Sequence, residues 1–320
     1  MSVYSPSGSG DVHVDQVLTQ ISVGYPNNGL VGEKLFPSVP VKKQSDIFYV
    51  FGRENWLPED DVRAPGAVAR EILGAAVSTE PYFAIEHSLQ IAVTDEERKN
   101  ADSPLNPDRD GTELVTSKIL LGRERAIQTL ATTAANYAST NTVTLSGTSQ
   151  WNDYTNSDPI GVMRTGKRAI HSRIFREPNK IVIPYAVMSV MEDHPDFLER
   201  IKYSERAIFS PELLASLLGF EEVIVPGVGI NTAPLGQPES LAYLWGNDVV
   251  MAYVPTRPGL KIPAYGYEFT WEGQTVDRWR ENPRKSDLIR CSRAYDHKMT
   301  AVDASDDQIA GYLILDAANV

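Results

Sequence analysis

Residues 110–137 read DGTELVTSKILLGRERAIQTLATTAANY, and this stretch decides the fold of the chain. Asp110 followed by Glu113 resembles the capping box that begins many helices. Apolar and small residues then recur at spacings of three and four, which is typical of one helix face: Val115, Ile119, Gly122, Ala126, Leu130, Ala134 and Tyr137. No proline interrupts the pattern, so it predicts a single helix over 110–139, about 42 Å long. Few helices in domains of this size are so long.

A long two-stranded ribbon is predicted before the helix. Residues 44–56 are rich in aromatic and β-branched residues, and residues 83–94 alternate between apolar and other side chains, which predicts a second strand with one buried face. His87 falls on the apolar face and is expected to be half-buried over a sheet. Between the strands, residues 57–66 hold two prolines, one glycine and three carboxylates, so they form the loop tip. A ribbon of this kind is marginal in water, and residues 41–95 are expected to need a partner surface.

The segments on either side complete the layout. Residues 1–40 are predicted to be an arm, because they have little apolar content of their own and begin with a Ser- and Gly-rich stretch that is no secretory signal. After residue 158 the pattern becomes mixed. Helices that begin at a proline are predicted over 159–172, 184–192, 195–203 and 211–218. Strands are predicted at 180–183, 222–225, 249–254, 265–271, 288–293 and 312–315.

Composition and charge exclude several classes of protein. The 320 residues are 42% hydrophobic and 22% charged, which fits an ordinary folded chain of two domains or of one domain with a large excursion. No apolar run approaches the length of a membrane helix, so a membrane partner is not expected. The single cysteine, Cys291, excludes internal disulfides. Lys and Arg number 30 against 42 Asp and Glu, and a net charge of −12 disfavours tight gripping of nucleic acid phosphates.

Three motifs resemble ligand-binding sites, but each lacks a residue or a helix that the ligand requires. Residues 161–168 nearly spell a phosphate-binding loop, but Arg168 stands where a Ser or Thr hydroxyl is needed. Residues 106–111 imitate the start of a calcium loop, but its twelfth position is Ser117 and not a glutamate. Residues 227–229 supply two glycines after a strand, but no helix begins there to receive a pyrophosphate.

No other residues suggest catalysis. The five histidines are scattered and none pairs with another at the spacing of a helical zinc site. Cys291 lies in a predicted strand and is expected to be a buried thiol. We therefore predict no catalytic, cofactor-binding or metal-ligating residue, no cofactor and no enzyme activity.

The order of arm, long ribbon, very long helix and mixed part resembles the major capsid protein of tailed bacteriophages, of the Hong Kong 97 type. The layout covers nearly the whole chain, and phrases between residues 151 and 225 add to it. These phrases are Ser157-Asp158-Pro159-Ile160, Pro178-Asn179-Lys180-Ile181-Val182-Ile183, His194-Pro195, Leu198-Glu199-Arg200-Ile201-Lys202-Tyr203 and Leu217-Leu218-Gly219.

The resemblance implies an α+β capsid fold in five parts. Residues 1–40 would be the N-terminal arm, and residues 41–95 the E-loop β-hairpin, which lies over a neighbouring subunit. Residues 96–158 would be the peripheral domain with a spine helix over 110–139. Residues 159–285 would be the axial domain, whose tips meet at the centres of hexamers and pentamers. Residues 286–320 would be strands that return to the peripheral and axial sheet.

The function that the resemblance implies is that of a structural subunit. It would self-assemble, as hexamers and pentamers, into the icosahedral or prolate head shell of a tailed bacteriophage, enclosing double-stranded DNA without sequence-specific binding. Further expected partners are a scaffolding protein, a portal and a decoration protein. The expected location is the virion head, and the host cytoplasm during assembly.

The expected assembly contacts lie at the tip of the ribbon: Trp56, Glu59, Asp60, Asp61 and Arg63. Some relatives of this type weld subunits by a lysine–asparagine bond from the E-loop. The tip contains no lysine, so no such crosslink is expected.

Two other functions stay open at this point. One is an encapsulin-like nanocompartment shell, which has the same fold and encloses an enzyme. The other is a soluble α/β enzyme that acts on a small molecule, and it predicts a small oligomer with a deep pocket near residues 180–230. The contents and size of the purified particles discriminate among the three.

Overall fold

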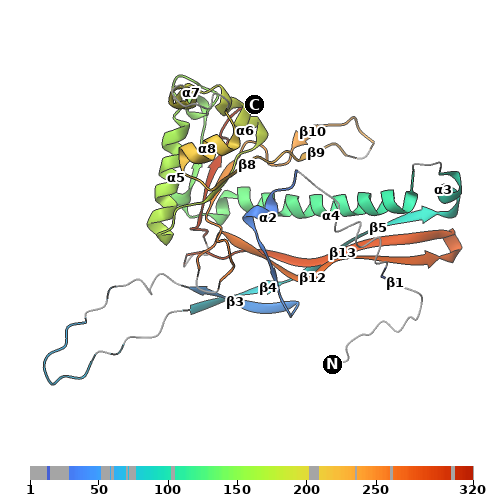
Figure 1. The fold of residues 1–320 in the computed structure, drawn as a ribbon, viewed down its shortest axis with the longest axis horizontal. Coiled ribbons are helices and arrows are strands. Elements are labelled where there is room, and N and C mark those ends of the chain that lie inside the picture. The colour runs from blue at the N-terminus through green and yellow to red at the C-terminus, as the bar shows by residue number, and fades with distance from the viewer. Residues whose placement is uncertain are drawn as a thin grey trace.

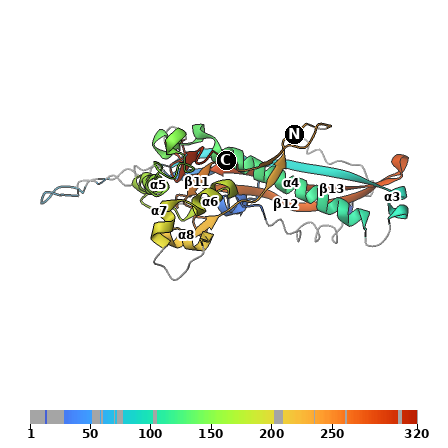
Figure 2. The ribbon, with the colours of Figure 1, turned by 90° about the horizontal axis from the view of Figure 1, so that it is seen from above.

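The structure is a computed structural model that describes residues 13–14, 29–51, 58, 61–69, 71, 77–101, 105–201, 209–234, 236–259, 262–303 and 307–319. Figure 1 shows two parts that share the long helix α4 (Pro107–Thr132). One part is an elongated sheet beside the helix, and the other is a compact α/β part at the end of the helix. Seen from above, the sheet and α4 extend to one side of the compact part (Figure 2).

Helix α4 begins earlier and ends earlier than the predicted 110–139. Pro107 is its first residue, and the Asn106 side chain accepts a hydrogen bond from the Arg109 N–H, so the capping box predicted at Asp110 is wrong. The helix ends because side chains satisfy its last carbonyl groups. The Asn136 amide donates to the carbonyl of Leu130 (2.8 Å), and a tyrosine hydroxyl donates to the next one. Short 3₁₀ turns follow at Ala134–Asn136 and Ser139–Asn141.

The buried face of α4 agrees with the predicted stripe only in its first half. Val115 and Ile119 are buried against the sheet, as predicted. Further along, the buried positions shift by one residue, because the helix turns Arg123 and Glu124 inward along with Ile127. The predicted positions Gly122 and Ala126 are exposed instead.

A long antiparallel hairpin forms the core of the elongated sheet. β12 (Gly266–Glu281) pairs with β13 (Ser286–Met299), and Lys285 takes a left-handed conformation in the turn between them. β5 (Ile85–Thr94) pairs with β13, while β1 (His13–Val14) and β2 (Ser38–Pro40) pair with β12. We call these five strands the long sheet. The boundary predicted at residue 285 falls inside the turn of this hairpin, so β12 belongs with β13 and not with the compact part.

The ribbon is shorter than the predicted 41–95. β3 (Ser45–Phe51) pairs with β4 (Val77–Phe83), whereas β5 joins the long sheet. The change of partner occurs at the buried Ala84, whose N–H and carbonyl both bond to Gln44. The prediction that residues 83–94 form the second strand of the ribbon is therefore wrong beyond Phe83. We keep the term ribbon for β3 and β4.

The compact part is a five-stranded sheet covered on both faces. Its strand order is β6 (Thr142–Thr144), β14 (Gly311–Leu315), β11 (Val249–Ala252), β7 (Lys180–Val182) and β8 (Glu222–Ile224). The helices around it are α5 (Pro159–Ile174), α6 (Tyr185–Glu192), α7 (Pro195–Ile201) and α8 (Pro211–Leu218). Alternate strand residues divide between two cores, so that Met251 joins the helices α5 to α8 and Val250 joins the end of α4.

Local chemistry explains where these helices lie. Asp158 caps α5 and Ser210 caps α8, each followed by proline at the first helical position, as predicted. Gly219 ends α8 in a left-handed conformation (φ 70°). A second small sheet, β9 (Gly229–Asn231) with β10 (Leu241–Tyr243), extends from the compact part above α4 in Figure 1. Short helix α3 (Asp95–Asn100) lies near the start of α4, and short helix α2 (Gly32–Leu35) lies against its second half, beside Glu124.

Candidate assembly surfaces

One face of the ribbon is apolar and uncovered. Its inner face packs on the long sheet, where the rings of Phe48 and Tyr82 lie 5.2 and 4.8 Å from the ring of Phe269. On the outer face, the side chains that are about half exposed are those of Ile47 (53%), Tyr49 (52%) and Phe83 (53%). Contiguous apolar surface of this kind marks an interaction site in a soluble protein.

The structure places two of the five predicted tip residues. Asp61 and Arg63 are both exposed, in a segment that turns at Pro65 and Gly66. Trp56, Glu59 and Asp60 lie outside the described residues. Two valines in the same segment are also strongly exposed, and Val68 is 93% exposed. These valines give the segment exposed apolar side chains that were not among the predicted assembly contacts.

β5 is exposed on both faces over most of its length. The sequence predicted one buried face, but every residue from Ile85 to Gln90 is exposed. The reason is that α4 covers only the far end of the strand, where Gly111 approaches the side chain of Ile91 and Val93 is buried. His87 is also exposed rather than half-buried, and its ring stacks on Tyr295 at 4.4 Å.

A buried ionic cluster joins α4 to the long sheet. Glu268 of β12 is 0% exposed and accepts hydrogen bonds from Arg123, from Arg293 at 2.6 Å and from His297 at 2.9 Å. Burial alone would raise the pKa of Glu268, but the His297 hydrogen bond and the two guanidinium groups outweigh it and lower the pKa to about 2. Glu268 is therefore ionised in the folded subunit and neutralises arginines on two elements.

Glu124, which follows Arg123 in α4, joins the helix to two further segments. The buried Glu124 carboxylate accepts hydrogen bonds from the N–H groups of Val31 (3.1 Å) and Gly32 (2.8 Å) and from the indole of Trp245 (2.9 Å). A Cβ on Gly32 would meet the side chain of Ile127 at 2.5 Å, so the close approach requires glycine. The carboxylate thus holds the start of α2, the long helix and the loop before β11 together.

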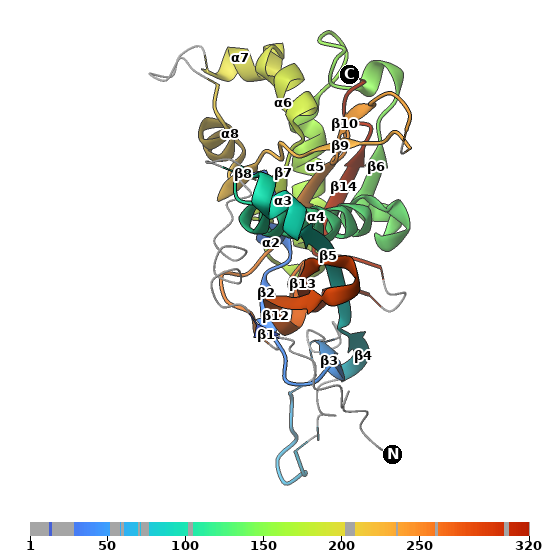
Figure 3. The ribbon, with the colours of Figure 1, turned by 90° about the vertical axis from the view of Figure 1, so that its right-hand side faces the viewer.

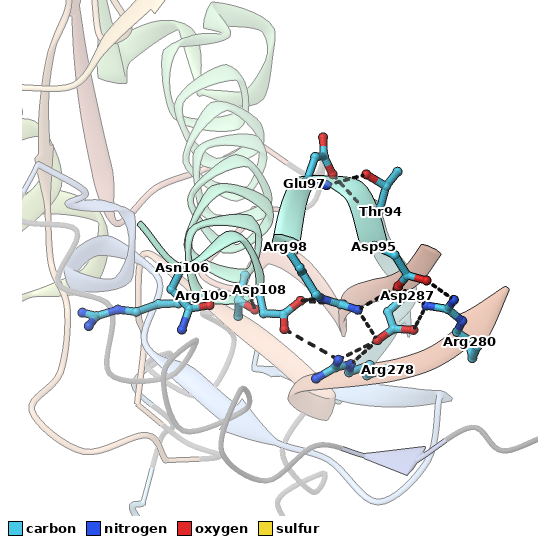
Figure 4. A network of polar contacts seen from close by, with 11 residues as sticks. Thr94, Asp95, Glu97, Arg98, Asn106, Asp108, Arg109, Arg278, Arg280 and Asp287 are labelled. Carbon is cyan, nitrogen blue, oxygen red and sulfur yellow. Dashed lines mark hydrogen bonds and ion pairs between the residues drawn. The ribbon is translucent and has the colours of Figure 1, made fainter. Parts of the chain in front are cut away.

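A polar cluster fixes the far end of the long sheet (Figure 4). It contains three arginines and three aspartates from α3, α4, β12 and β13: Asp95, Arg98, Asp108, Arg278, Arg280 and Asp287. Arg280 donates to both oxygens of Asp95, at 2.6 and 2.5 Å. Arg98 lies between Asp108 (2.7 Å) and Asp287 (2.8 Å). The balanced charges hold the turn between β12 and β13 against the start of α4.

Acid is expected to loosen this end of the sheet. Hydrogen bonds from Arg280 lower the pKa of Asp95, and the pKa of Asp287 is also lowered because bonds from Arg278 and Arg280 outweigh its burial. A carboxyl group whose pKa is lowered by folding stabilises the folded state at pH values above its unfolded pKa of about 3.9. This stabilisation is lost as the pH falls through the pKa of the folded state. The backbone amides of residues 282 and 284–286 should therefore exchange hydrogen at the same rate in wild type and in Arg280→Gln at low pH, but severalfold more slowly in wild type at pH 7. Equal exchange at pH 7 would contradict the prediction.

Neither sequence periodicity nor motif analysis revealed these polar residues as sites. A buried glutamate gives no hydrophobic signal, and its partners are far away in sequence. One sequence signal could have indicated that Arg123 and Glu124 are buried. They follow Val115 and Ile119 at the four- and five-residue spacing of the same helix face. Cys291 is buried, as expected, and lies among the apolar side chains under α4.

Neither a cluster of metal-ligating side chains nor a membrane-spanning helix occurs in the described residues. Within them, no cluster of three or more His, Cys, Asp or Glu side chains could hold a metal ion. No helix in the described ranges is both long and apolar enough to cross a membrane. An open groove of about 510 Å³ runs along the outer side of α4 from Gly122 to Thr133 and reaches Asn136. We call it the α4 groove, and it lies outside the 180–230 region in which an enzyme pocket was expected.

Two curated proteins are similar to this chain over most of its length. The major capsid protein of Burkholderia phage BcepMu is 30% identical over 306 residues, which cover 94% of this chain and 95% of the relative. The major capsid protein of Pseudomonas phage JBD67 is 30% identical over 272 residues, which cover 83% and 84%. No family model matches the chain.

Solved structures share the fold over nearly the whole chain. A phage-related protein from Bordetella bronchiseptica RB50 is 26% identical with a TM-score of 0.75, covering 96% of this chain and 98% of that protein. The mature capsid of bacteriophage PhiM1 is 10% identical, with a TM-score of 0.56 and coverage of 98% and 91%. A virus-like particle from Pyrococcus furiosus is 12% identical, with a TM-score of 0.54 and coverage of 93% and 97%.

Proposed function

Because the chain belongs to the bacteriophage major capsid proteins, we propose that its copies assemble into the icosahedral or prolate head shell of a tailed phage and enclose double-stranded DNA. It has the α+β Hong Kong 97-type fold and is a structural protein rather than an enzyme. The observation that carries the proposal is the similarity to capsid proteins along almost the full length of both chains.

The exposed apolar surfaces agree with a task of association. The outer face of the ribbon, the segment of the tip around Asp61 and the strand β5 all expose side chains that a lone subunit does not cover. Association of copies removes these apolar side chains from water. Burial of apolar surface is the dominant favourable free-energy term in most protein association. The proposed unit of the shell is a ring of six or five copies.

We assign the parts of the chain as follows. Residues 1–40 form the arm, and the E-loop is the part of residues 41–95 that precedes β5, with the ribbon as its described core. The peripheral domain contains α4 as the spine helix together with β5, β12 and β13 of the long sheet. The axial domain begins at residue 159 and contains α5 to α8.

Further partners follow from the proposed assembly. A separate scaffolding protein would guide the shell, a portal would occupy one vertex, and a decoration protein could bind outside. The net charge of −12 fits a container that encloses DNA without gripping its phosphates. Assembly would occur in the host cytoplasm, and the mature protein would reside in the virion head.

The alternative in the same fold is a nanocompartment that encloses an enzyme. The particle from P. furiosus shares the fold alone, whereas the phage capsid proteins also share sequence. Negative-stain microscopy and nuclease digestion of the purified material distinguish a phage shell from a nanocompartment. Shells that protect DNA, from phage-infected cells, support the proposal. A stable small oligomer or a packaged enzyme overturns it.

Replacing the tip by a flexible linker should impair assembly and leave the subunit folded. Replacement of residues 57–66 by a Gly/Ser linker of equal length removes Asp61 and Arg63, which contribute exposed surface and no core contact. We expect an unchanged melting temperature of the subunit and roughly tenfold fewer shells. Sedimentation measures the shells, and normal yield would refute the assignment of the tip as an assembly contact.

The absence of lysine from residues 56–66 predicts that mature particles contain no lysine–asparagine crosslink from this tip. A denaturing gel of boiled, reduced particles should show one band at the mass of the chain. A ladder of covalent multimers would contradict the prediction.

A further inference from the structure

Helix α5 and the loop after it form a basic stretch in an acidic chain. Residues 159–180 contain six lysines and arginines against one carboxylate, Glu177, which gives them a net charge of +5 with histidine neutral. The chain as a whole carries −12. Three of the six cations form hydrogen bonds within the subunit: Lys167, Arg173 and Lys180. The other three are available for a contact outside it.

These other three cations are the exposed arginines Arg164, Arg168 and Arg176, and we call them the α5 surface. Among the described residues, none of the three forms an ion pair, although the chain contains 42 carboxylates. In the polar cluster of Figure 4, by contrast, every arginine contacts at least one aspartate. The α5 surface therefore does not serve to hold the subunit together.

The fold fixes the direction in which α5 presents its charges. Arg164 and Arg168 are four residues apart and lie on one face of the helix. The opposite face is buried in the core of the compact part, where a Cβ on Gly166 would overlap the side chain of Met251. In Figure 1, α5 runs along the outer edge of the compact part. Arg176 follows directly after the end of the helix, so the three arginines are spread over ~15 Å or more.

The stability of α5 does not account for these charges. Like charges four residues apart on a helix repel each other. Cations stabilise the last turn of a helix through its dipole, and His171 and Arg173 occupy that turn. Arg164 lies in the first half of the helix, where the dipole disfavours a cation. The α5 surface therefore points to an anionic partner outside the subunit.

The basic surface is confined to α5 within this part of the molecule. The helices α6, α7 and α8 lie together at one side of the compact part (Figure 3). They expose three glutamates and one arginine: Glu192, Glu199, Glu212 and Arg200. An extended line of arginines suits a linear partner with dense negative charge. Double-stranded DNA carries one negative charge per ~1.7 Å of its axis, and arginine can bind phosphate oxygens through two parallel hydrogen bonds.

We propose that the α5 surface contacts the phosphate backbone of the enclosed double-stranded DNA. The inference rests on the proposed shell function and adds the site at which each copy touches the DNA. Three phosphate contacts per copy are few, so one copy binds weakly and without regard to sequence. Such a sparse contact is compatible with the net charge of −12, which disfavours binding of DNA over the rest of the surface.

The first test measures DNA binding by full-length subunits before assembly. The probe is a fluorescent duplex of about 20 base pairs, and its anisotropy is followed from roughly 50 to 200 mM salt. The slope of log K against log salt should be about −2.7 in wild type, because each of three phosphate contacts contributes about −0.9. In Arg168→Gln the slope should lose about 0.9 in magnitude, equally for duplexes of different sequence.

The matched control for this test is Arg125→Gln. Arg125 is an exposed arginine of α4 and lies outside the α5 surface, so the variant should bind the duplex like wild type. Absence of duplex binding by wild type, or an equal loss in Arg125→Gln, overturns the inference.

The second test locates the contact in particles. Phenylglyoxal modifies accessible arginines, and mass spectrometry measures the modification of each one in DNA-filled and in empty shells. The three arginines of the α5 surface should react severalfold more slowly in filled shells, while Arg125 reacts equally in both. Equal rates at the α5 surface overturn the inference while the shell function stands, and slow rates in both kinds of shell assign this surface to a neighbouring copy. If the wild-type chain never forms shells, the shell function and this inference are both wrong.

Discussion

Replacing Ile119 by aspartate is expected to destabilise the subunit by about 3–5 kcal/mol, enough to remove most of the stability of an ordinary domain. Ile119 is 5% exposed and lies between α4 and the long sheet, among Val115, Val276 and Ile289. An ionised carboxylate at this place would lose its hydration among apolar side chains. Urea unfolding of dissociated subunits, followed by circular dichroism, measures the change as a lower midpoint.

The matched control lies on the same helix. Leu114 is 48% exposed, so Leu114→Asp keeps its carboxylate in water and should change the free energy of unfolding by no more than about 0.5 kcal/mol. If the two aspartate variants unfold at the same urea concentration, α4 does not pack on the long sheet through the face described above. Leu130 belongs to the same predicted apolar stripe, but this residue is only partly buried and lines the α4 groove.

Local chemistry made the helices of the compact part predictable. Asp158-Pro159 and Ser210-Pro211 combine a side chain that caps a helix with a proline that suits its first position, so each start could be predicted from two adjacent residues. The end of α4 could not be predicted in this way. It depends on Asn136 and Tyr137, which fold back on the last carbonyl groups after the helix has already ended.

The long hairpin was predicted only in fragments, at 265–271 and 288–293. Its middle contains Glu272, Gly273 and Gln274, where the register of β12 shifts, and this polar interruption ends the strand pattern in the sequence. Charged strand residues such as Asp277 and Arg290 form a pair across the ladder at 2.5 Å, so they satisfy one another in a way that hydropathy does not detect.

The predicted assembly site was chosen for composition rather than for position. A loop rich in proline and carboxylates indicates exposure but does not identify the surface that it meets. The apolar outer face of the ribbon became visible only when Phe48 and Tyr82 were seen to occupy the inner face. The pairing of β5 with β13, rather than with β3, is a long-range choice that no local pattern determines.

Replacing Glu268 by glutamine is expected to have an effect as large as that of the Ile119 variant. The amide keeps the shape of the side chain but removes the charge that neutralises Arg123 and Arg293, and both arginines are largely buried. Removal of one partner from a buried ion pair typically costs about 3–5 kcal/mol, because the other charge stays buried without compensation. Glu113→Gln, which breaks an exposed pair with Arg109 on the same helix, should cost no more than about 0.5 kcal/mol.

Two further readouts separate loss of charge from loss of packing. The pKa of Glu268 is about 2 in the folded subunit and 4.5 in its ordinary state, so its contribution is complete above pH 4.5 and is lost as the pH falls towards 2. Glu268→Gln should lack this part of the acid dependence when unfolding is measured from pH 7 to 2. The double variant Arg123→Met with Glu268→Gln should recover part of the stability, because a methionine leaves one fewer uncompensated charge. A double variant that is less stable than Glu268→Gln would show that Arg123 stabilises the helix by packing, and the ionic cluster would then not be what joins α4 to the sheet.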